Sequence, residues 1–473
     1  MIASPNPVPT TTREAIAPWT IDDKAPEDDP VVITTVSYNE DIKGCDSSQT
    51  SDVGAGVDFS KTTAVISVTE DSEVPEGGYG WAVVAGCATL TFWFGGTTYS
   101  WGVMQVALVN QGLADASTLA FVGSTTIASI AAFAVINARI VRVLGARRTA
   151  LLGVFLMGVG ETAASFSTNS IGSLFGTESI LMGAGVSLCF MVSSVTPAQY
   201  FKKRRGLANG AVYAAAGLGG TGIAFLMDAI NQKLGVEWTF RIVGISMLVT
   251  GLPMAFLVKD RIRVSPSKEW VEWQLFKDFR FVTIFLCGLV TTFPLFVPVF
   301  FIPLYAQSFG IPSIGGAGLV AAFQFASFIG RLGGGASADF IGPLNTMVLS
   351  LFLNAISMLL IWPFSTSVGP LTVFVILNGA ANGAFFSSMP TVVANMFGVA
   401  RLSVAMGMVV TAWTGGYLLG SPIAGYILNA TGSENDVHSY LPTIFYAGGL
   451  SALALVFALM TRVIVSRHIV HIV

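Results

Sequence analysis

Charged residues are scarce in this sequence. They make up 11% of the 473 residues, whereas hydrophobic residues make up 53% and the mean hydropathy is +0.70. Soluble domains carry about 25% charged residues, so this chain has too few charges to cover a surface in water. The composition excludes a water-soluble globular fold and predicts an integral membrane protein.

Residues for metal binding and covalent chemistry are also few. The three histidines lie in polar segments, and the four cysteines show neither zinc-ligand nor disulfide spacing. The sequence therefore predicts no metal site, no bound cofactor and no enzyme. Lys and Arg occur in short clusters between apolar runs, a pattern that argues against nucleic-acid binding. The N-terminal residues lack the apolar core of a signal peptide.

The N-terminal segment differs in composition from the rest of the chain. Residues 1–78 hold 15 of the 27 acidic residues but only 4 of the 24 basic ones, and they are rich in Pro, Ser and Thr without helical periodicity. This composition predicts a disordered acidic cytoplasmic tail. Two roles remain open for it: a solvated spacer, or a regulatory segment modified at Lys24, Lys43 or Lys61.

Apolar runs long enough to cross a bilayer begin near residue 80. Twelve can be placed, at 81–107, 118–138, 149–167, 172–199, 207–227, 238–257, 281–305, 317–337, 346–364, 371–396, 402–427 and 440–463. The loops after the second, fourth and sixth runs are basic, whereas those after the first, third, seventh and ninth contain no Lys or Arg. Because basic loops stay in the cytoplasm, this alternation predicts twelve crossings with both termini cytoplasmic.

The apolar part of the chain repeats internally. Arg205 and Arg401 are related by an offset of 196 residues, and the turns at Gly145 and Gly342 by 197. Nearly equal offsets at separate junctions predict two six-helix halves in parallel duplication. The expected divisions are an N-terminal half at 79–257, a cytoplasmic central loop with an interfacial helix at 258–280, a C-terminal half at 281–463 and a cytoplasmic tail at 464–473.

Two motifs resemble those of a known family. Pro75-Glu-Gly-Gly-Tyr-Gly-Trp81 precedes the first run, and Tyr200-Phe-Lys-Lys-Arg-Arg-Gly-Leu-Ala-Asn-Gly210 opens the fifth. Both resemble signatures of the monocarboxylate porters, a branch of the major facilitator superfamily, and the acidic tail resembles that of fungal members. The resemblance implies an all-α membrane protein with twelve transmembrane helices in two pseudo-symmetric halves that rock around a midplane site.

The same resemblance implies a secondary active transporter, which moves a small organic acid or related metabolite by alternating access, with a proton as candidate co-substrate. An exporter of a fungal secondary metabolite is the alternative within transport. A nutrient sensor signalling through the N-terminal tail is the alternative of another class. The expected location is the bilayer of the plasma membrane, and the fold requires no oligomer.

Two positions depart from the animal members of that family. Their first span carries a lysine, whereas run 81–107 contains no charge. They also place an aspartate one turn before the arginine of the eighth span, where this chain has Ser327. The resemblance therefore leaves proton coupling unassigned.

Arg331 in the eighth run is the strongest candidate for cargo binding. A guanidinium group in hydrocarbon is costly, so we expect it to face a wet cavity or a partner, and its planar fork suits a carboxylate. The alternative is a side chain that snorkels to the interface. Further candidates are the neutral polar residues Tyr99, Asn209, Tyr213, Gln324, Asn378, Asn382 and Trp413. The i, i+4 pair of asparagines equally suits helix–helix packing.

Two further groups of charged residues are candidates for gating and coupling. Residues at the predicted cytoplasmic helix ends can bind neighbouring helix termini and stabilise an outward-facing state; these are Arg142, Arg147, Arg205 and Asp339. Glu161 and Glu178 lie toward the outer ends of their runs and are candidates for proton coupling, because a buried carboxyl can titrate. The alternative for both is a hydrogen-bonded or hydrated structural acid.

Overall fold

The computed structural model describes residues 76–114, 116–262, 270–431 and 437–466, and all regular structure within them is helical. The predicted acidic tail lies outside the described residues, apart from residues 76–78. The elements of the N-terminal half are α2 (Tyr79–Asn110), α3 (Ala116–Ala132), α4 (Ala134–Leu144), α5 (Ala146–Ala164), α6 (Ile171–Leu174), the π-helix η1 (Phe175–Met182), α7 (Gly183–Val195), the 3-10 helix η2 (Pro197–Gln199), α8 (Arg205–Leu234) and α9 (Val236–Leu257).

The C-terminal half has a matching series of helices. Its elements are the 3-10 helix η3 (Trp273–Lys277), α10 (Phe279–Leu295), α11 (Val297–Ser308), α12 (Ser313–Ile341), α13 (Pro343–Ile356), the π-helix η4 (Ser357–Ile361), the 3-10 helix η5 (Trp362–Phe364), α14 (Val368–Phe397), α15 (Val399–Thr431), the 3-10 helix η6 (Val437–Tyr440) and α16 (Leu441–Val465). Each predicted apolar run corresponds to one continuous, bent or broken segment of this series.

Two of these segments contain a clear break. Helices α3 and α4 meet at Phe133 with a bend of 54°. Helices α10 and α11 are separated at Phe296, next to Pro294 and Pro298, which remove backbone donors and disfavour continued helix. By length and composition alone, eight segments among the described residues can cross a membrane, and the bent α3–α4 pair makes up to nine.

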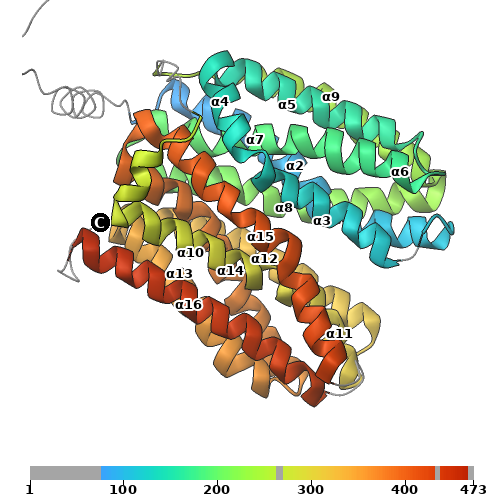
Figure 1. Cartoon of the computed structure of the whole chain (residues 1–473). Coiled ribbons are helices and arrows are strands. Elements are labelled where there is room, and N and C mark those ends of the chain that lie inside the picture. The colour runs from blue at the N-terminus through green and yellow to red at the C-terminus, as the bar shows by residue number, and fades with distance from the viewer. Residues whose placement is uncertain (1–75, 115, 263–269, 432–436, 467–473) are drawn as a thin grey trace, which may run out of the picture. The chain divides into compact units, whose positions relative to one another are not determined.

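Helices α2–α9 and α10–α16 form two bundles, which Figure 1 shows above (blue to green) and below (yellow to red). The main contact between them joins α8 to α12. Both bundles turn between their second and third spans on a glycine of positive φ: Gly145 at 81°, directly before α5, and Gly342 at 96°, directly before α13. The sequence offset therefore has a structural counterpart, because only glycine adopts this conformation freely.

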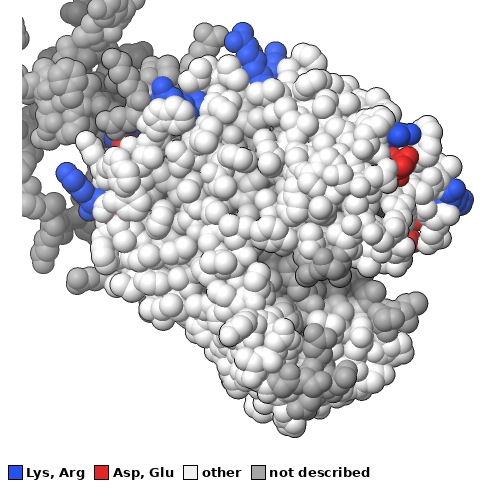
Figure 2. All heavy atoms as spheres, turned by 45° about the vertical axis from the view of Figure 1, so that its right-hand side comes forward, with Lys and Arg blue, Asp and Glu red and all other residues white. Residues whose placement is uncertain are grey.

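We call one end of the bundles the basic side, defined by Arg142, Arg147, Lys202, Arg205 and Lys259; it lies at the left in Figure 1. The other end is the opposite side. Between the two ends the surface is apolar, with Phe225, Val249 and Phe325 exposed to 72%, 66% and 58%. Figure 2 shows a broad uncharged band on this face, with Lys, Arg, Asp and Glu near its margins. Such a surface is suited to lipid.

The described part of the central loop contacts both halves at the basic side. Trp270, which is half exposed, lies under the guanidinium of Arg139 at 4.9 Å. Glu272 forms an ion pair of 3.7 Å with Arg401 of α15. The 3-10 helix η3 follows, within the region where the sequence predicts an interfacial helix.

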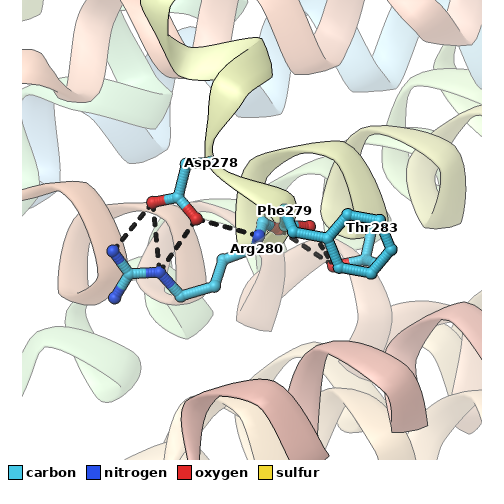
Figure 3. Close-up of polar contacts among 4 residues, drawn as sticks. All are labelled: Asp278, Phe279, Arg280 and Thr283. Atoms are coloured by element: carbon cyan, nitrogen blue, oxygen red, sulfur yellow. Dashed lines mark hydrogen bonds and ion pairs between the residues drawn. The ribbon is translucent and has the colours of Figure 1, made fainter.

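Asp278 caps the first helix of the C-terminal half. Its carboxylate accepts hydrogen bonds from the backbone N–H of Arg280 at 2.9 Å and from the Arg280 side chain, with a shortest distance of 2.7 Å (Figure 3). These hydrogen bonds lower the pKa of Asp278. N-cap carboxylates satisfy backbone donors that the helix leaves unpaired.

Replacing Asp278 with alanine should lower the stability of the protein by about 1 kcal/mol, the usual contribution of an N-cap. Because the pKa of Asp278 is lower in the folded chain, the carboxylate stabilises the fold at neutral pH. That contribution is lost as the pH falls through the folded pKa. The measurement is the melting temperature in detergent, where Asp278→Ala should fall below wild type at neutral pH and approach it in acid. Lys277→Ala is the matched control and should melt like wild type.

Candidate functional site

A cavity lies between the two bundles, and most residues that line it are near the middle of their helices. Its free volume is about 30 Å³, which is room for a water-sized molecule. Its lining is mostly aromatic and aliphatic, with a few polar groups and one cation: Phe94, Gly95, Thr98, Tyr99, Ile127, Ile130, Phe190, Tyr213, Ala216, Phe296, Arg331, Phe386 and Tyr417. Small-molecule sites combine such an apolar wall with few polar groups that fix orientation.

Arg331 crosses from α12 of the C-terminal half to the N-terminal half. Its Nη1 donates to the backbone carbonyl oxygen of Tyr213 at 3.1 Å, and its Nη2 donates to the hydroxyl of Tyr99 at 3.0 Å. The guanidinium carbon lies 5.6 Å from the ring centroids of both Tyr99 and Phe386. The side chain therefore faces the cavity, and the residue is only 3% exposed.

The charge of Arg331 is not neutralised within the described residues. No carboxylate forms an ion pair with it there, and its buried Nε has no hydrogen-bond partner. The guanidinium carries five N–H donors in a fixed fork, which binds a carboxylate in two places. The cavity therefore offers an anion one buried cation between aromatic faces.

The remaining predicted cargo residues fall into two groups. Tyr99 and Tyr213 line the cavity with Arg331. Trp413 lies next to it, with its ring 6.1 Å from Phe190, and its buried Nε1 has no partner among the described residues.

The four polar residues without aromatic rings lie outside the cavity lining. Asn378 donates to Asn354 at 3.0 Å and to Ser357 at 2.9 Å, within the C-terminal half. Asn382 donates to the carbonyl of Leu295 at 3.1 Å. These bonds join helices, the second of the two roles open for this pair. Gln324 is half-buried on α12.

Asn209 of α8 contributes to the contact between the halves. Its Nδ2 donates to the Thr391 hydroxyl of α14 at 2.8 Å. Its Oδ1 is buried without a hydrogen-bond partner among the described residues.

Asp339 and Arg205 connect the two halves at the basic side. The carboxylate of Asp339, on α12, accepts from the backbone N–H groups of Gly206 and Leu207 at 2.7 and 2.8 Å, at the N-terminus of α8. Arg205 donates to Asn395 of α14 at 2.7 Å. The positive end of the α8 dipole favours this carboxylate.

Glycines let α8 and α12 approach closely beside this contact. We call Gly206 and Gly210 of α8 with Gly335 of α12 the glycine seam. A Cβ atom on Gly335 would collide with the carbonyl oxygen of Gly206, and one on Gly210 would lie 2.7 Å from the carbonyl oxygen of Arg331. The halves therefore meet at the basic side, whereas the ends of α6 and α11 lie apart at the right in Figure 1.

Arg142 and Arg147 lie in a cleft at the basic side rather than in the seam. The cleft has a free volume of about 680 Å³ and is lined by residues of both halves, including Arg148, Lys259 and Ser403. Arg147 donates to the carbonyl of Val258 at 3.2 Å, which joins α5 to the end of α9.

The two motifs that carry the family resemblance contact each other. The Glu76 carboxylate accepts from the backbone N–H groups of Lys202 and Lys203 at 2.9 and 2.5 Å. The Trp81 ring lies 5.0 Å from that of Phe201. The first motif thus fixes the loop that leads into α8 and the glycine seam.

Glu161 and Glu178 lie away from the central cavity. They are 1% and 4% exposed, at the contact between α5 and η1 near the opposite side. The Oε2 atom of each is buried without a hydrogen-bond partner among the described residues.

Sequence reasoning missed most of the cavity wall. Phe94, Phe190, Phe296 and Phe386 line the cavity, yet phenylalanine in an apolar run faces lipid as often as it faces a cavity. Thr391 was also missed as the partner of Asn209. The sequence offers one signal for such residues: on a helical wheel, a residue that shares a helix face with Arg331 or Tyr213 is a candidate for the cavity wall.

Comparisons with known proteins agree with this architecture. A model of the major facilitator superfamily matches residues 81–336 and 284–469. MFS-type transporter 1 of an Ophiocordyceps species is 26% identical over 412 residues, covering 86% of this chain and 90% of its own. Monocarboxylate transporter 10 of Danio rerio is 28% identical and covers 79% of this chain and 77% of its own. The aspyridones efflux protein apdF of Emericella nidulans is 27% identical, covering 81% and 79%.

Solved structures share the same fold. The human organic anion transporter MFSD10 superposes with a TM-score of 0.63 at 15% identity, covering 81% of this chain and 100% of its own. The Escherichia coli fucose–proton symporter superposes with a TM-score of 0.65 at 13% identity, covering 81% of this chain and 99% of its own. The predicted all-α fold of twelve transmembrane helices in two halves is confirmed, as is the multi-pass membrane location. This chain is a membrane transport protein of the major facilitator superfamily.

Proposed function

We propose that this protein is a secondary active transporter of organic carboxylates, which bind to Arg331 in the central cavity and pass between the halves by alternating access. The observation that carries the proposal is the buried Arg331 guanidinium, which no carboxylate neutralises among the described residues. An unpaired buried cation is costly, and a carboxylate cargo supplies the missing charge.

The wall of the cavity favours a cargo with an apolar body. Aromatic rings from both halves surround the cation. Among the described lining residues, four supply hydroxyl groups: Thr98, Tyr99, Tyr213 and Tyr417. The free volume of the cavity in this conformation, about 30 Å³, is well below that of drug-sized sites, about 300–1,000 Å³, so cargo enters only when the halves move apart. The relatives include both monocarboxylate transporters and an efflux protein for aspyridones.

The test is a cargo panel in proteoliposomes that contain the full chain. Carboxylic acids are graded from small aliphatic to larger aromatic ones, and each is paired with its neutral amide as a matched control. The acids should be transported and the amides should not, because the amide lacks the charge that Arg331 binds. Equal flux of acids and amides would contradict the proposal.

Export of a larger secondary metabolite is the second candidate within transport. The aromatic wall and the efflux proteins among the relatives support it. The same panel separates the two candidates: a small-acid porter should prefer the smallest acids, whereas an exporter should prefer aromatic ones. We place the basic side in the cytoplasm, according to the distribution of Lys and Arg. The plasma membrane is the location that we propose.

A nutrient sensor is the alternative of another class. Removing residues 1–70 tests it, because a transporter should keep its flux, whereas a sensor that signals through its tail should lose signalling. Normal flux in the truncated chain supports transport as the primary function.

A further inference from the structure

Glu161 and Glu178 form a pair of carboxyl groups that has no ion-pair partner in the part of the chain that the structure describes. Both side chains are at least 96% buried, at the contact between α5 and η1. The backbones touch at this level, since a Cβ atom on Gly160 would lie 2.7 Å from the Met182 nitrogen. The two carboxyl groups also interact electrostatically. Two ionised carboxylates buried in this way would repel each other and would lose their hydration.

The equivalent place in the C-terminal half is neutral. Ser357 follows Glu161 by 196 residues, the offset that relates Arg205 to Arg401. There Ser357 and Asn354 accept hydrogen bonds from Asn378. The third and fourth spans of the C-terminal half are therefore joined by amide and hydroxyl groups. The fold therefore does not require carboxyl groups at this contact, and their presence in one half points to a function.

The elements around the pair supply no positive charge to it. Helices α3 and α6 contain no titratable residue, and the nearest one on α7 is Cys189, which lies against Gly153 two turns toward the basic side. On α9, Arg241 pairs with Glu237 at 3.8 Å and donates to Ser165 at 3.2 Å.

The other neighbours of α5 carry their charges elsewhere. On α2, Tyr99 contacts Arg331, and Cys87 is buried against Ser193. On α4, Arg139 and Arg142 lie at the basic side.

The pair is connected to the cavity through α3. Glu178 lies in a π-helix, a wide turn that occurs often at functional sites. The backbone oxygen of Glu178 accepts from Thr126 at 3.4 Å, and Ser179 donates to the carbonyl of Val122 at 2.9 Å. The next turn of α3 carries Ile127 and Ile130, which line the cavity. A change of charge on the pair therefore acts on a helix that contacts cargo.

We propose that Glu161 and Glu178 form a proton-binding site separate from the cargo cavity, in which at least one of the two carboxyl groups is protonated in this conformation. The pair releases the proton when movement of η1 against α3 admits water, and it takes up a proton again when the contact closes. The proposed proton binding depends only on the two glutamates, whereas the coupling of proton release to cargo movement rests on the proposed transport function.

Infrared spectroscopy of the purified full chain tests the protonation directly. Wild type should show the stretching band of a protonated carboxyl group at neutral pH, shifted in heavy water. The double variant Glu161→Gln/Glu178→Gln should lack that band, because its amides keep the shape but hold no exchangeable acid proton. Glu237→Gln removes an exposed carboxyl from the same half and should leave the band unchanged. A band that persists in the double variant, or its absence from wild type, overturns the proposal.

A flux measurement then tests the coupling. In proteoliposomes with a pH difference across the membrane, wild type should accumulate cargo, whereas the double variant should exchange cargo at equilibrium without accumulating it. If accumulation by the double variant follows the pH difference as in wild type, the coupling is overturned. If wild type moves no carboxylate at all, the proposed transport function fails, and the infrared result still decides the proton site.

Discussion

Replacing Arg331 with glutamine should weaken the binding of a carboxylate cargo by at least about 30-fold, since removing one partner of a buried, hydrogen-bonded charge pair costs about 2–5 kcal/mol. Glutamine keeps a donor but loses the charge and the fork. The effect should appear as a higher KM for the acid in proteoliposome uptake, or as a loss of flux when the cargo no longer saturates the site.

Two further variants separate the charge from the local structure. Arg331→Lys keeps the positive charge but cannot reach Tyr213 and Tyr99 together in the geometry of the fork, so its affinity should lie between wild type and glutamine. Arg401→Gln removes an exposed arginine that pairs with Glu272 at the basic side and should transport like wild type. An unchanged KM in Arg331→Gln, with the protein folded, would remove the carboxylate anchor.

Replacing Gly335 with leucine should prevent the halves from meeting at the basic side. A Cβ atom there collides with the backbone oxygen of Gly206, which no change of rotamer relieves. Overpacking of this kind costs about 1–3 kcal/mol, or a shift of about 5- to 150-fold between conformations. A cysteine introduced by Thr391→Cys, at a position 1% exposed here, should become reactive to a thiol reagent added from the basic side.

The same helix offers a matched control for this experiment. Gly333 has nothing within 4 Å of the place a Cβ would take, so Gly333→Leu should leave the labelling of Thr391→Cys as low as in wild type. Asp339→Ala removes the two hydrogen bonds to the start of α8 without adding bulk, and it should raise the labelling less than Gly335→Leu does. Equal labelling in Gly333→Leu and Gly335→Leu would show that the seam does not close the basic side.

The positions of the helices were predictable from sequence because membrane-spanning runs obey a length rule that side-chain packing cannot override. The interruptions divide into two kinds. The break at Phe296 has a local cause in Pro294 and Pro298. The bend at Phe133 has no Gly or Pro beside it, and the π-helix around Glu178 contains Gly176 but no Pro, so hydropathy marks neither as a break. Both depend on contacts with neighbouring helices, which lie far away in the sequence.

The candidate site was predictable only in its charged part. Arg331 stood out because a cation in an apolar run needs an explanation, and the structure places it in the cavity with Tyr99 and Tyr213. Asn378 and Asn382 carried the same polar signal but bond to neighbouring helices instead. Which side of a helix faces a cavity depends on how the bundles dock, and hydropathy is nearly the same for lipid and for a protein interior.

The glycine seam also bears on how easily the transporter cycles. Because backbone meets backbone at Gly206 and Gly335, parting the two helices leaves no large apolar side chain without a neighbour at that point. Rejoining them freezes no rotamers there, so little conformational entropy is lost on closure. Side chains therefore do not interdigitate at the glycine seam. Polar contacts beside it, such as the hydrogen bond from Gly206 to Asp339, hold the two helices together there, and little packing has to be broken for them to separate at that point.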